Sequence, residues 1–168
     1  MAAYLDTCIV SGLVRGDLPA AEQAALIRLL EARKRGDVHL VTSEITKGEI
    51  GQIPEQHRRL HEIMYSLLED VPAAVTHQVD CGLLLLGAGG GTREDPLFSY
   101  LKALLPDLAD AEHVFQAAKN QVDHFLTADQ RTIVKHATAV EAACGLKVVT
   151  PVKFAEILGL GSSSRRDQ

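Results

Sequence analysis

The 168-residue sequence has few of the residues that build disulfide frameworks, stacking surfaces and membrane spans. It contains three cysteines, no tryptophan and only 4% aromatic residues. The odd number and wide spacing of Cys8, Cys81 and Cys144 fit neither a set of disulfides nor a structural zinc site. No apolar run reaches the roughly 18 residues that a membrane span requires. These absences predict a globular protein in a reducing compartment, without a membrane partner.

The amino-terminal residues bear on the expected cellular location, and the net charge bears on nucleic-acid binding. Residues 1–6 read MAAYLD, without the basic start and apolar stretch of a secretory leader, which predicts a cytoplasmic protein. Seventeen Lys and Arg residues against 22 Asp and Glu residues give a net charge of −5. Domains that hold duplex DNA through overall positive charge usually have a pI above about 9, whereas this chain has a pI near 5.8. A nucleic acid would therefore be attracted by a local patch or by a bound metal ion.

Hydrophobic patterning predicts alternating strands and helices. Apolar residues make up 46% of the chain, enough for a core, and the length fits one domain at about 150 residues per domain. We expect strands at 4–6, 38–41, 124–126 and 146–150, and helices at 9–15, 19–36, 43–50, 54–68, 77–86, 96–105, 108–119, 130–143 and 151–159. Strands separated by helices predict an α/β/α sandwich of three layers around a parallel sheet of about four to five strands. Residues 1–160 form the expected single domain, and residues 161–168 a disordered polar tail.

Four acidic residues from distant stretches are expected at one edge of this sheet. Asp6 and Asp129 follow strands, Glu49 lies on the helix after the second strand, and Asp110 lies early in the helix that leads to the third. The carboxyl ends of parallel strands are where ligands gather in such folds. Neighbouring carboxylates repel one another, and a divalent cation reverses that repulsion. Oxygen ligands alone favour Mg²⁺ or Mn²⁺ over Zn²⁺.

Two other patterns have simpler interpretations. The glycine-rich residues 87–92 read GAGGGT and follow a predicted helix, so we interpret them as a loop and not as a phosphate-binding loop, which requires a preceding strand. Residues 28–61 hold seven Lys and Arg residues against five acids, which fits a phosphate-contacting surface and ordinary solvated helix faces about equally well.

Five segments resemble the PIN-domain family of metal-dependent ribonucleases, in the order in which that family has them. They read YLDT at 4–7, SEITKGEI at 43–50, DAEHVFQAA at 110–118, VDHFLTAD at 122–129 and VVTP at 148–151. The resemblance implies that Asp6, Glu49, Asp110 and Asp129 bind Mg²⁺ or Mn²⁺ and that Thr127 supplies a hydroxyl beside them. Two further positions come from the same segments. Asp123 is a reserve candidate acid, and Cys8 stands where many members of the family have Asn.

The resemblance also implies an activity and partners. It implies a metal-dependent endoribonuclease whose activated water attacks the scissile phosphorus and leaves a 5′-phosphate and a 3′-hydroxyl. Single-stranded or structured RNA is the implied substrate, a small antitoxin protein is an implied partner if the chain is a VapC-like toxin, and a homodimer is the implied assembly. The main alternative is a catalytically silent PIN-fold module that binds RNA or protein. A phosphatase of the haloacid dehalogenase type is disfavoured, because Cys8 occupies the position of its second Asp.

Overall fold

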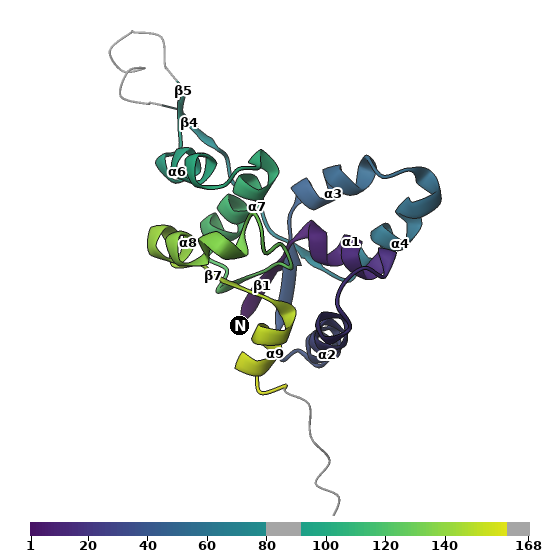
Figure 1. Cartoon of the computed structure of the whole chain (residues 1–168). Coiled ribbons are helices and arrows are strands. Elements are labelled where there is room, and N and C mark those ends of the chain that lie inside the picture. Colours follow the sequence, from purple (N-terminus) through teal and green to yellow (C-terminus); the bar gives the residue numbers. More distant parts are fainter. Residues whose placement is uncertain (80–91, 161–168) are drawn as a thin grey trace, which may run out of the picture.

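A parallel sheet of five short strands runs through the computed structural model, which describes residues 1–79 and 92–160 (Figure 1). The strands lie in the order β3-β2-β1-β6-β7, and every neighbouring pair is parallel. Their bounds are β1 Ala2–Leu5, β2 His39–Thr42, β3 Glu69–Asp70, β6 His124–Leu126 and β7 Lys147–Val149. A separate antiparallel pair, β4 His77–Val79 and β5 Thr92–Glu94, projects beyond α6 (Figure 1).

Helices cover both faces of the sheet and complete the three-layer sandwich that the sequence predicts. The helices that share a core with one face are α1 Thr7–Arg15, α2 Ala20–Arg35 and α9 Pro151–Ile157. Those on the other face are α6 Pro96–Leu104, α7 Leu108–Lys119 and α8 Ala137–Cys144, which follows the short 3₁₀ turn η1 Val134–His136. Two further helices, α3 Glu44–Gly51 and α4 Glu55–Tyr65, follow β2, and α4 packs beside α1.

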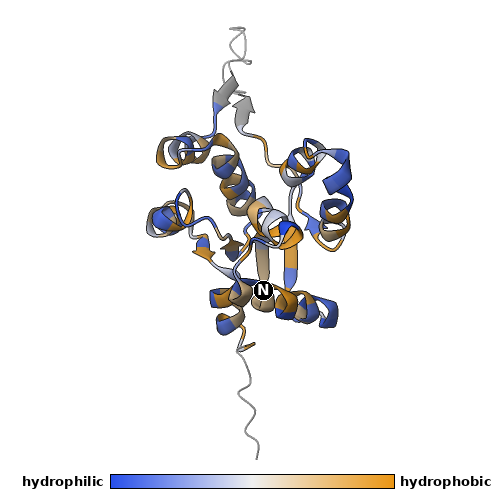
Figure 2. Cartoon of the chain, turned by 45° about the vertical axis from the view of Figure 1, so that its right-hand side comes forward, coloured by the Kyte–Doolittle hydropathy of each residue, from blue (hydrophilic) through white to orange (hydrophobic). Residues whose placement is uncertain are grey.

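The alternation of side chains along β1 explains why both faces are covered. Successive residues of a strand point to opposite faces. Ala3 and Leu5 accordingly join the core under α1, α2 and α9, whereas Tyr4 joins the core under α6 and α7. All three are fully buried. Strands β1, β2, β6 and β7 are mostly hydrophobic, whereas the helices mix hydrophobic and hydrophilic residues, as expected for elements with one buried side (Figure 2).

Several predicted elements differ in the structure. Within the predicted helix at 77–86, residues 77–79 form strand β4, and the remainder lies outside the described residues. The predicted helix at 130–143 begins only at Ala137, after turns and η1. The helix predicted at 54–68 has an apolar stripe at Leu60, Ile63, Met64, Leu67 and Leu68. Of these residues, Met64 and Leu68 pack against the core, whereas Leu60 and Ile63 are more than half exposed, and His61 is the buried residue of α4.

Some sequence interpretations fall on residues that the structure does not describe. The glycine-rich segment, apart from Thr92, lies outside the described residues, as do Cys81 and the tail at 161–168. Among the described residues, no helix has the length and apolar character needed to cross a membrane.

Candidate functional site

The four predicted acids line one cavity at the carboxyl edge of the sheet. This acidic cavity has a volume of about 380 Å³, and Asp6, Glu49, Asp110 and Asp129 all contribute to its wall. They come from the end of β1, from α3, from the first turn of α7 and from the segment after β6. Asp107, which precedes α7, also lines it. Parallel strands and the helices between them thus bring together residues up to 123 positions apart in the sequence.

Asp6 is held in place by donors from the start of α1 and from the segment that follows β6. It is 4% exposed and caps the amino terminus of α1 by accepting a hydrogen bond from the Cys8 backbone amide. Its Oδ2 accepts from the Thr127 hydroxyl at 2.6 Å and from the Cys8 thiol at 2.9 Å. Burial, and then the charge of Asp6, raise the pKa of the Cys8 thiol, which therefore stays protonated as a donor. Cys8, at the position where many members of the PIN-domain family have Asn, thus makes a polar contact to Asp6.

Thr127 acts through Asp6 and does not line the acidic cavity. Its side chain is fully buried, and its Oγ1 also accepts from the Asp129 backbone amide at 3.0 Å. One hydroxyl therefore joins the first acid of the cavity to the segment that carries the last one. The hydroxyl predicted beside the acids thus binds Asp6 and the segment of Asp129, an arrangement that fits a positioning residue.

Glu49 is oriented by a buried histidine. His113 Nε2 lies 3.1 Å from Glu49 Oε2, and His113 Nδ1 lies 2.8 Å from the Tyr4 hydroxyl, which in turn lies 2.6 Å from Ser43 Oγ. Burial alone would raise the pKa of Glu49, but the hydrogen bond from His113 brings that pKa below its ordinary value. Burial likewise opposes a charged His113, whereas the bond to Glu49 and the charges of nearby acids raise its pKa. Both directions favour an ionised Glu49 with a donating imidazole beside it.

The pKa values of Asp110 and Asp129 are shifted in opposite directions. Burial, followed by the negative charges of Asp6, Asp107 and Asp129, raises the pKa of Asp110 to about 6. Burial would also raise the pKa of Asp129, but its Oδ1 accepts from the backbone amides of Arg131 and Thr132 at 2.8 and 2.9 Å, and its pKa is lowered. Of these two acids, Asp110 is therefore the one whose ionised form the cavity disfavours.

The donor set fits a hard divalent cation in its chemistry but forms no closed cage. Carboxylate oxygens are the ligands that Mg²⁺ and Mn²⁺ prefer, and burial together with the charges of the neighbouring acids raises the pKa of Asp110, which a bound cation would reverse. Among the described residues, however, no three His, Cys, Asp or Glu side chains are placed to hold a metal ion as they stand. Asp6 and Glu49 already accept hydrogen bonds from protein groups, so a cation would share these two carboxylates with protein donors.

Two sequence candidates lie apart from this cavity. Asp123, the reserve acid, lies next to the amino end of β6, and its Oδ2 accepts from the Ala2 backbone amide at 2.9 Å. It does not line the acidic cavity. The expected basic surface is divided between α2 and the α3–α4 region. On α2, Arg33 pairs with Glu69 and Arg35 with Asp37.

The hydrogen bonds that Tyr4, Cys8 and Ser43 make around the acidic cavity were not predicted from the sequence. Tyr4 lies in strand β1 and Ser43 precedes α3, and the Tyr4 hydroxyl bonds both to Ser43 Oγ and to His113 Nδ1. Ser43 makes no side-chain cap bond to α3, so its polar group is used in this chain of hydrogen bonds. The available signal was a tyrosine in a buried strand, since a buried phenol usually finds a hydrogen-bond partner.

Comparisons with known proteins identify the fold. Neither a family model nor a curated protein matches this sequence. A solved structure with a similar fold is the crystal structure of VapBC2 from Rickettsia felis bound to a DNA fragment from their promoter. The aligned chain of that structure is 16% identical, the alignment covers 89% of this chain and 98% of that chain, and the TM-score is 0.57. At that identity the two chains share a fold, and the α/β/α sandwich predicted from the sequence is confirmed.

Proposed function

We propose that this protein is a Mg²⁺- or Mn²⁺-dependent endoribonuclease with a single PIN-like domain spanning residues 1–160. One observation carries the proposal: Asp6, Glu49, Asp110 and Asp129 come from four separate stretches and line one cavity at the carboxyl edge of the sheet. Carboxylates that share a site repel one another, so their gathering reduces the stability of the empty protein. Such an arrangement is favourable when a cation binds there.

The carboxylates of Asp6, Asp110 and Asp129 would hold the cation, with Glu49 as a further ligand or as the group that orients water. When bound, the cation would activate water and neutralise charge on the phosphate. In the hydrolysis, the oxygen of water bonds to phosphorus, the bond to the 3′ oxygen breaks, and that oxygen takes up a proton. The product ends are a 5′-phosphate and a 3′-hydroxyl.

The protein side chains around these acids have separate tasks. His113 holds the carboxylate of Glu49 on the cavity side, ionised and able to orient or accept a proton from water. Thr127 and Cys8 hold Asp6 through its Oδ2. The backbone amides after Asp129 hold its Oδ1, which leaves Oδ2 for a ligand. These fixed donors reduce the reorganisation needed when charge develops on the phosphate.

The test is cleavage of end-labelled single-stranded RNA with Mn²⁺, with EDTA, and by the Asp6→Asn variant. Asn also caps helices, so the variant is expected to keep α1. The proposal predicts cutting with Mn²⁺ only, lost in Asp6→Asn and Asp110→Asn and retained in Glu31→Gln, an exposed helix position outside the cavity. Cutting that persists in EDTA or in both cavity variants would refute it.

A second candidate function is a catalytically silent module that binds RNA or protein. The observation in its favour is that no three potential ligands among the described residues are placed to hold a metal as they stand. This function predicts RNA binding or partner binding that is unchanged by Asp6→Asn and by EDTA, without cleavage of diverse RNAs. The same set of assays therefore separates the two candidates.

Partners follow from the proposed family role. The structural neighbour is a VapBC2 complex, so we propose a small antitoxin as a partner. From the sequence analysis, we also propose a homodimer as the assembly and the cytoplasm as the location. A short reading frame beside the gene whose product co-elutes with this chain in size-exclusion chromatography would support the toxin role. A chain that elutes as a monomer and inhibits no growth on expression would contradict it.

A further inference from the structure

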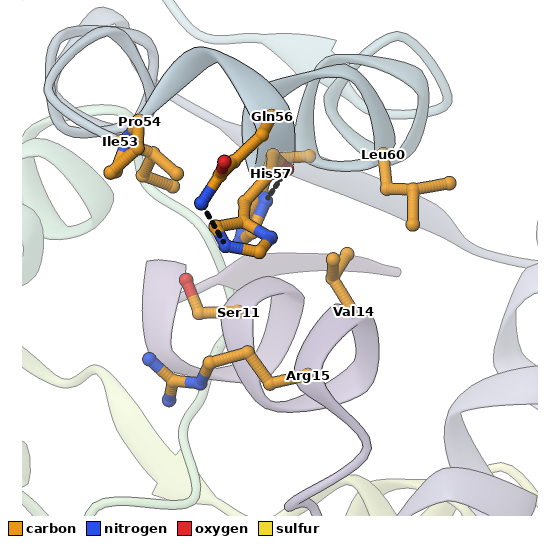
Figure 3. Close-up of a pocket in the computed structure, with 9 residues that line it drawn as sticks. Ser11, Val14, Arg15, Ile53, Pro54, Gln56, His57 and Leu60 are labelled. Carbon is orange, nitrogen blue, oxygen red and sulfur yellow. Dashed lines mark hydrogen bonds between the residues drawn. The ribbon is translucent and has the colours of Figure 1, made fainter.

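A second cavity lies beside the acidic cavity, between α1 and α4 (Figure 3). This α1–α4 cavity has a volume of about 630 Å³, within the range of about 300–1,000 Å³ that is usual for small-ligand sites. Ser11, Arg15 and Ile53 line both cavities. The two spaces therefore adjoin, and one extended ligand can occupy both.

The two cavities differ in charge. Five carboxylates line the acidic cavity, whereas no carboxylate is among the described residues that line the α1–α4 cavity. The latter has one guanidinium, from Arg15, and two imidazoles, from His57 and His61, together with a hydroxyl and an amide. A ligand that spans both must combine a group suited to a cation-loaded acidic site with a neutral, hydrogen-bonding group.

The walls of the α1–α4 cavity combine flat, apolar and polar surfaces. The exposed His57 ring lies between α4 and α1, with the Gln56 side-chain nitrogen 3.1 Å from its Nε2 (Figure 3). Val14 and Leu60 supply apolar surface, and Leu60 is 57% exposed although it is a large hydrophobic residue. Imidazole and guanidinium planes stack on unpaired RNA bases, and amides and hydroxyls bind base edges.

Arg15 is placed to bind a phosphate between the two cavities. Its Nε donates to Asp17 at 2.9 Å, but the side chains of this pair are 63% and 57% exposed. Exposed ion pairs of this kind contribute little, so a phosphate can replace Asp17 as the partner. Ser11, on the same helix, adds a hydroxyl at the junction. Arginine and hydroxyl groups are common phosphate ligands in nucleic-acid complexes.

We propose that the α1–α4 cavity is a subsite for one nucleobase of single-stranded RNA, next to the nucleotide whose phosphate enters the acidic cavity. This inference rests on the proposed function and adds a substrate-reading element to it. A protein segment fits the cavity less well. Helices α1 and α4 satisfy their own backbone groups and offer no edge for strand addition, and a groove for a helical peptide needs a more continuous apolar floor.

The first test measures RNA binding without cleavage. Fluorescence anisotropy in EDTA gives the Kd of a labelled single-stranded RNA for the wild type, His57→Ala and Leu60→Glu. Loss of stacking on one base is expected to raise Kd about 5- to 100-fold. The control is His39→Ala, which removes another exposed histidine at the amino end of β2. Both histidines are exposed, so melting temperatures are expected to match the wild type.

The second test locates the base directly. RNA carrying 4-thiouridine is cross-linked to the protein by light, and the linked peptide is identified by mass spectrometry. The proposal expects linkage within residues 53–61 or 11–15, and its loss in Leu60→Glu. Unchanged affinity in both variants, with linkage elsewhere, would overturn the subsite and leave the cavity to a protein segment.

The outcomes separate this inference from the proposed function. Tighter binding by the wild type than by His57→Ala, without metal-dependent cleavage, supports the subsite and refutes the nuclease. Metal-dependent cleavage with equal Kd values and equal cut sites in wild type and His57→Ala refutes the subsite and leaves the nuclease in place.

Discussion

Replacing Asp110 with Asn is expected to stabilise the metal-free protein near neutral pH. Burial, and then the charges of Asp6, Asp107 and Asp129, raise the pKa of this carboxyl from 3.8 to about 6 in the folded protein. An acid with a raised folded pKa contributes its full stabilisation below the unfolded pKa, and that contribution is lost as pH rises through about 6. Asn is close in size to Asp and carries no charge, so it removes the cost of burying an ionised carboxylate beside other acids.

The expected magnitude follows from the same shift. Each pKa unit corresponds to about 1.4 kcal/mol, so a rise of about two units sets an upper limit of about 3 kcal/mol. Asp110 is only half-buried, and solvent screens part of this, so we expect about 1–2 kcal/mol at pH 7.5. For a chain of this length, that gain corresponds to a rise in Tm of roughly 2–8 °C. By linkage, about a third of the gain remains at pH 4.5.

The assay is urea and thermal denaturation in EDTA at pH 7.5 and pH 4.5. Wild type, Asp110→Asn and the exposed-site control Glu31→Gln are compared at each pH. Comparing variants at one pH removes the contribution of the other titrating groups. Equal or lower stability of Asp110→Asn at pH 7.5, or a gain of the same size at both pH values, would refute the electrostatic reasoning.

Three further predictions concern the groups around the acidic cavity. Thr127→Val removes the 2.6 Å hydrogen bond to Asp6 and is expected to lower the free energy of unfolding by about 1–3 kcal/mol in urea titrations, with Thr127→Ser close to wild type. His113→Leu leaves Glu49 and Tyr4 without their shared partner and is expected to cost about 2–4 kcal/mol, whereas an unchanged midpoint would show that these hydrogen bonds contribute nothing net. Mn²⁺ is expected to raise the Tm saturably at pH 7.5 and progressively less below about pH 6, where protons compete for Asp110, as measured by differential scanning fluorimetry.

Strong local signals explain which elements were predicted well. The α7 helix spans Leu108–Lys119, and β6 spans His124–Leu126, both as predicted from the sequence. A capping Asp107 and a continuous apolar pattern mark the helix, and the strand is apolar throughout its central residues. These signals lie within a few residues of the element that they predict.

The missed elements depend on partners that a local pattern does not reveal. Strand β3 is two exposed acids, Glu69 and Asp70, which form a strand by pairing with the end of β2. Strand β4 is three residues long and exists through its pairing with Thr92–Glu94. In α4, the helix was predicted and Met64 packs against the core, but the burial of His61 and the exposure of Leu60 were not predicted, because they depend on the tertiary position of that helix.

The acids that line the candidate site could be predicted from the sequence, but their hydrogen-bond partners could not. The order of strands and helices was enough to place the four acids at one edge, because the carboxyl ends of parallel strands share an edge. Which side chain binds which acid depends on rotamers and on distances across the sheet. The pairing of His113 with Glu49 and of Cys8 with Asp6 therefore appeared only in the structure.

The pKa values of the acids in the cavity shift in different directions, and this difference bears on the function of the cavity. Glu49 has His113 beside it, and Asp129 has two backbone amides, so the pKa of each lies below its ordinary value. Asp110 has a raised pKa, so the fold retains an acid that destabilises it at neutral pH. A module that only binds RNA gains nothing from that acid, since phosphate and carboxylate repel each other. A cation-dependent enzyme does gain, because the cation converts the repulsion into binding energy. If Mn²⁺ reverses the stability order of wild type and Asp110→Asn, the acid serves cation binding, whereas an order that Mn²⁺ leaves unchanged favours the binding module.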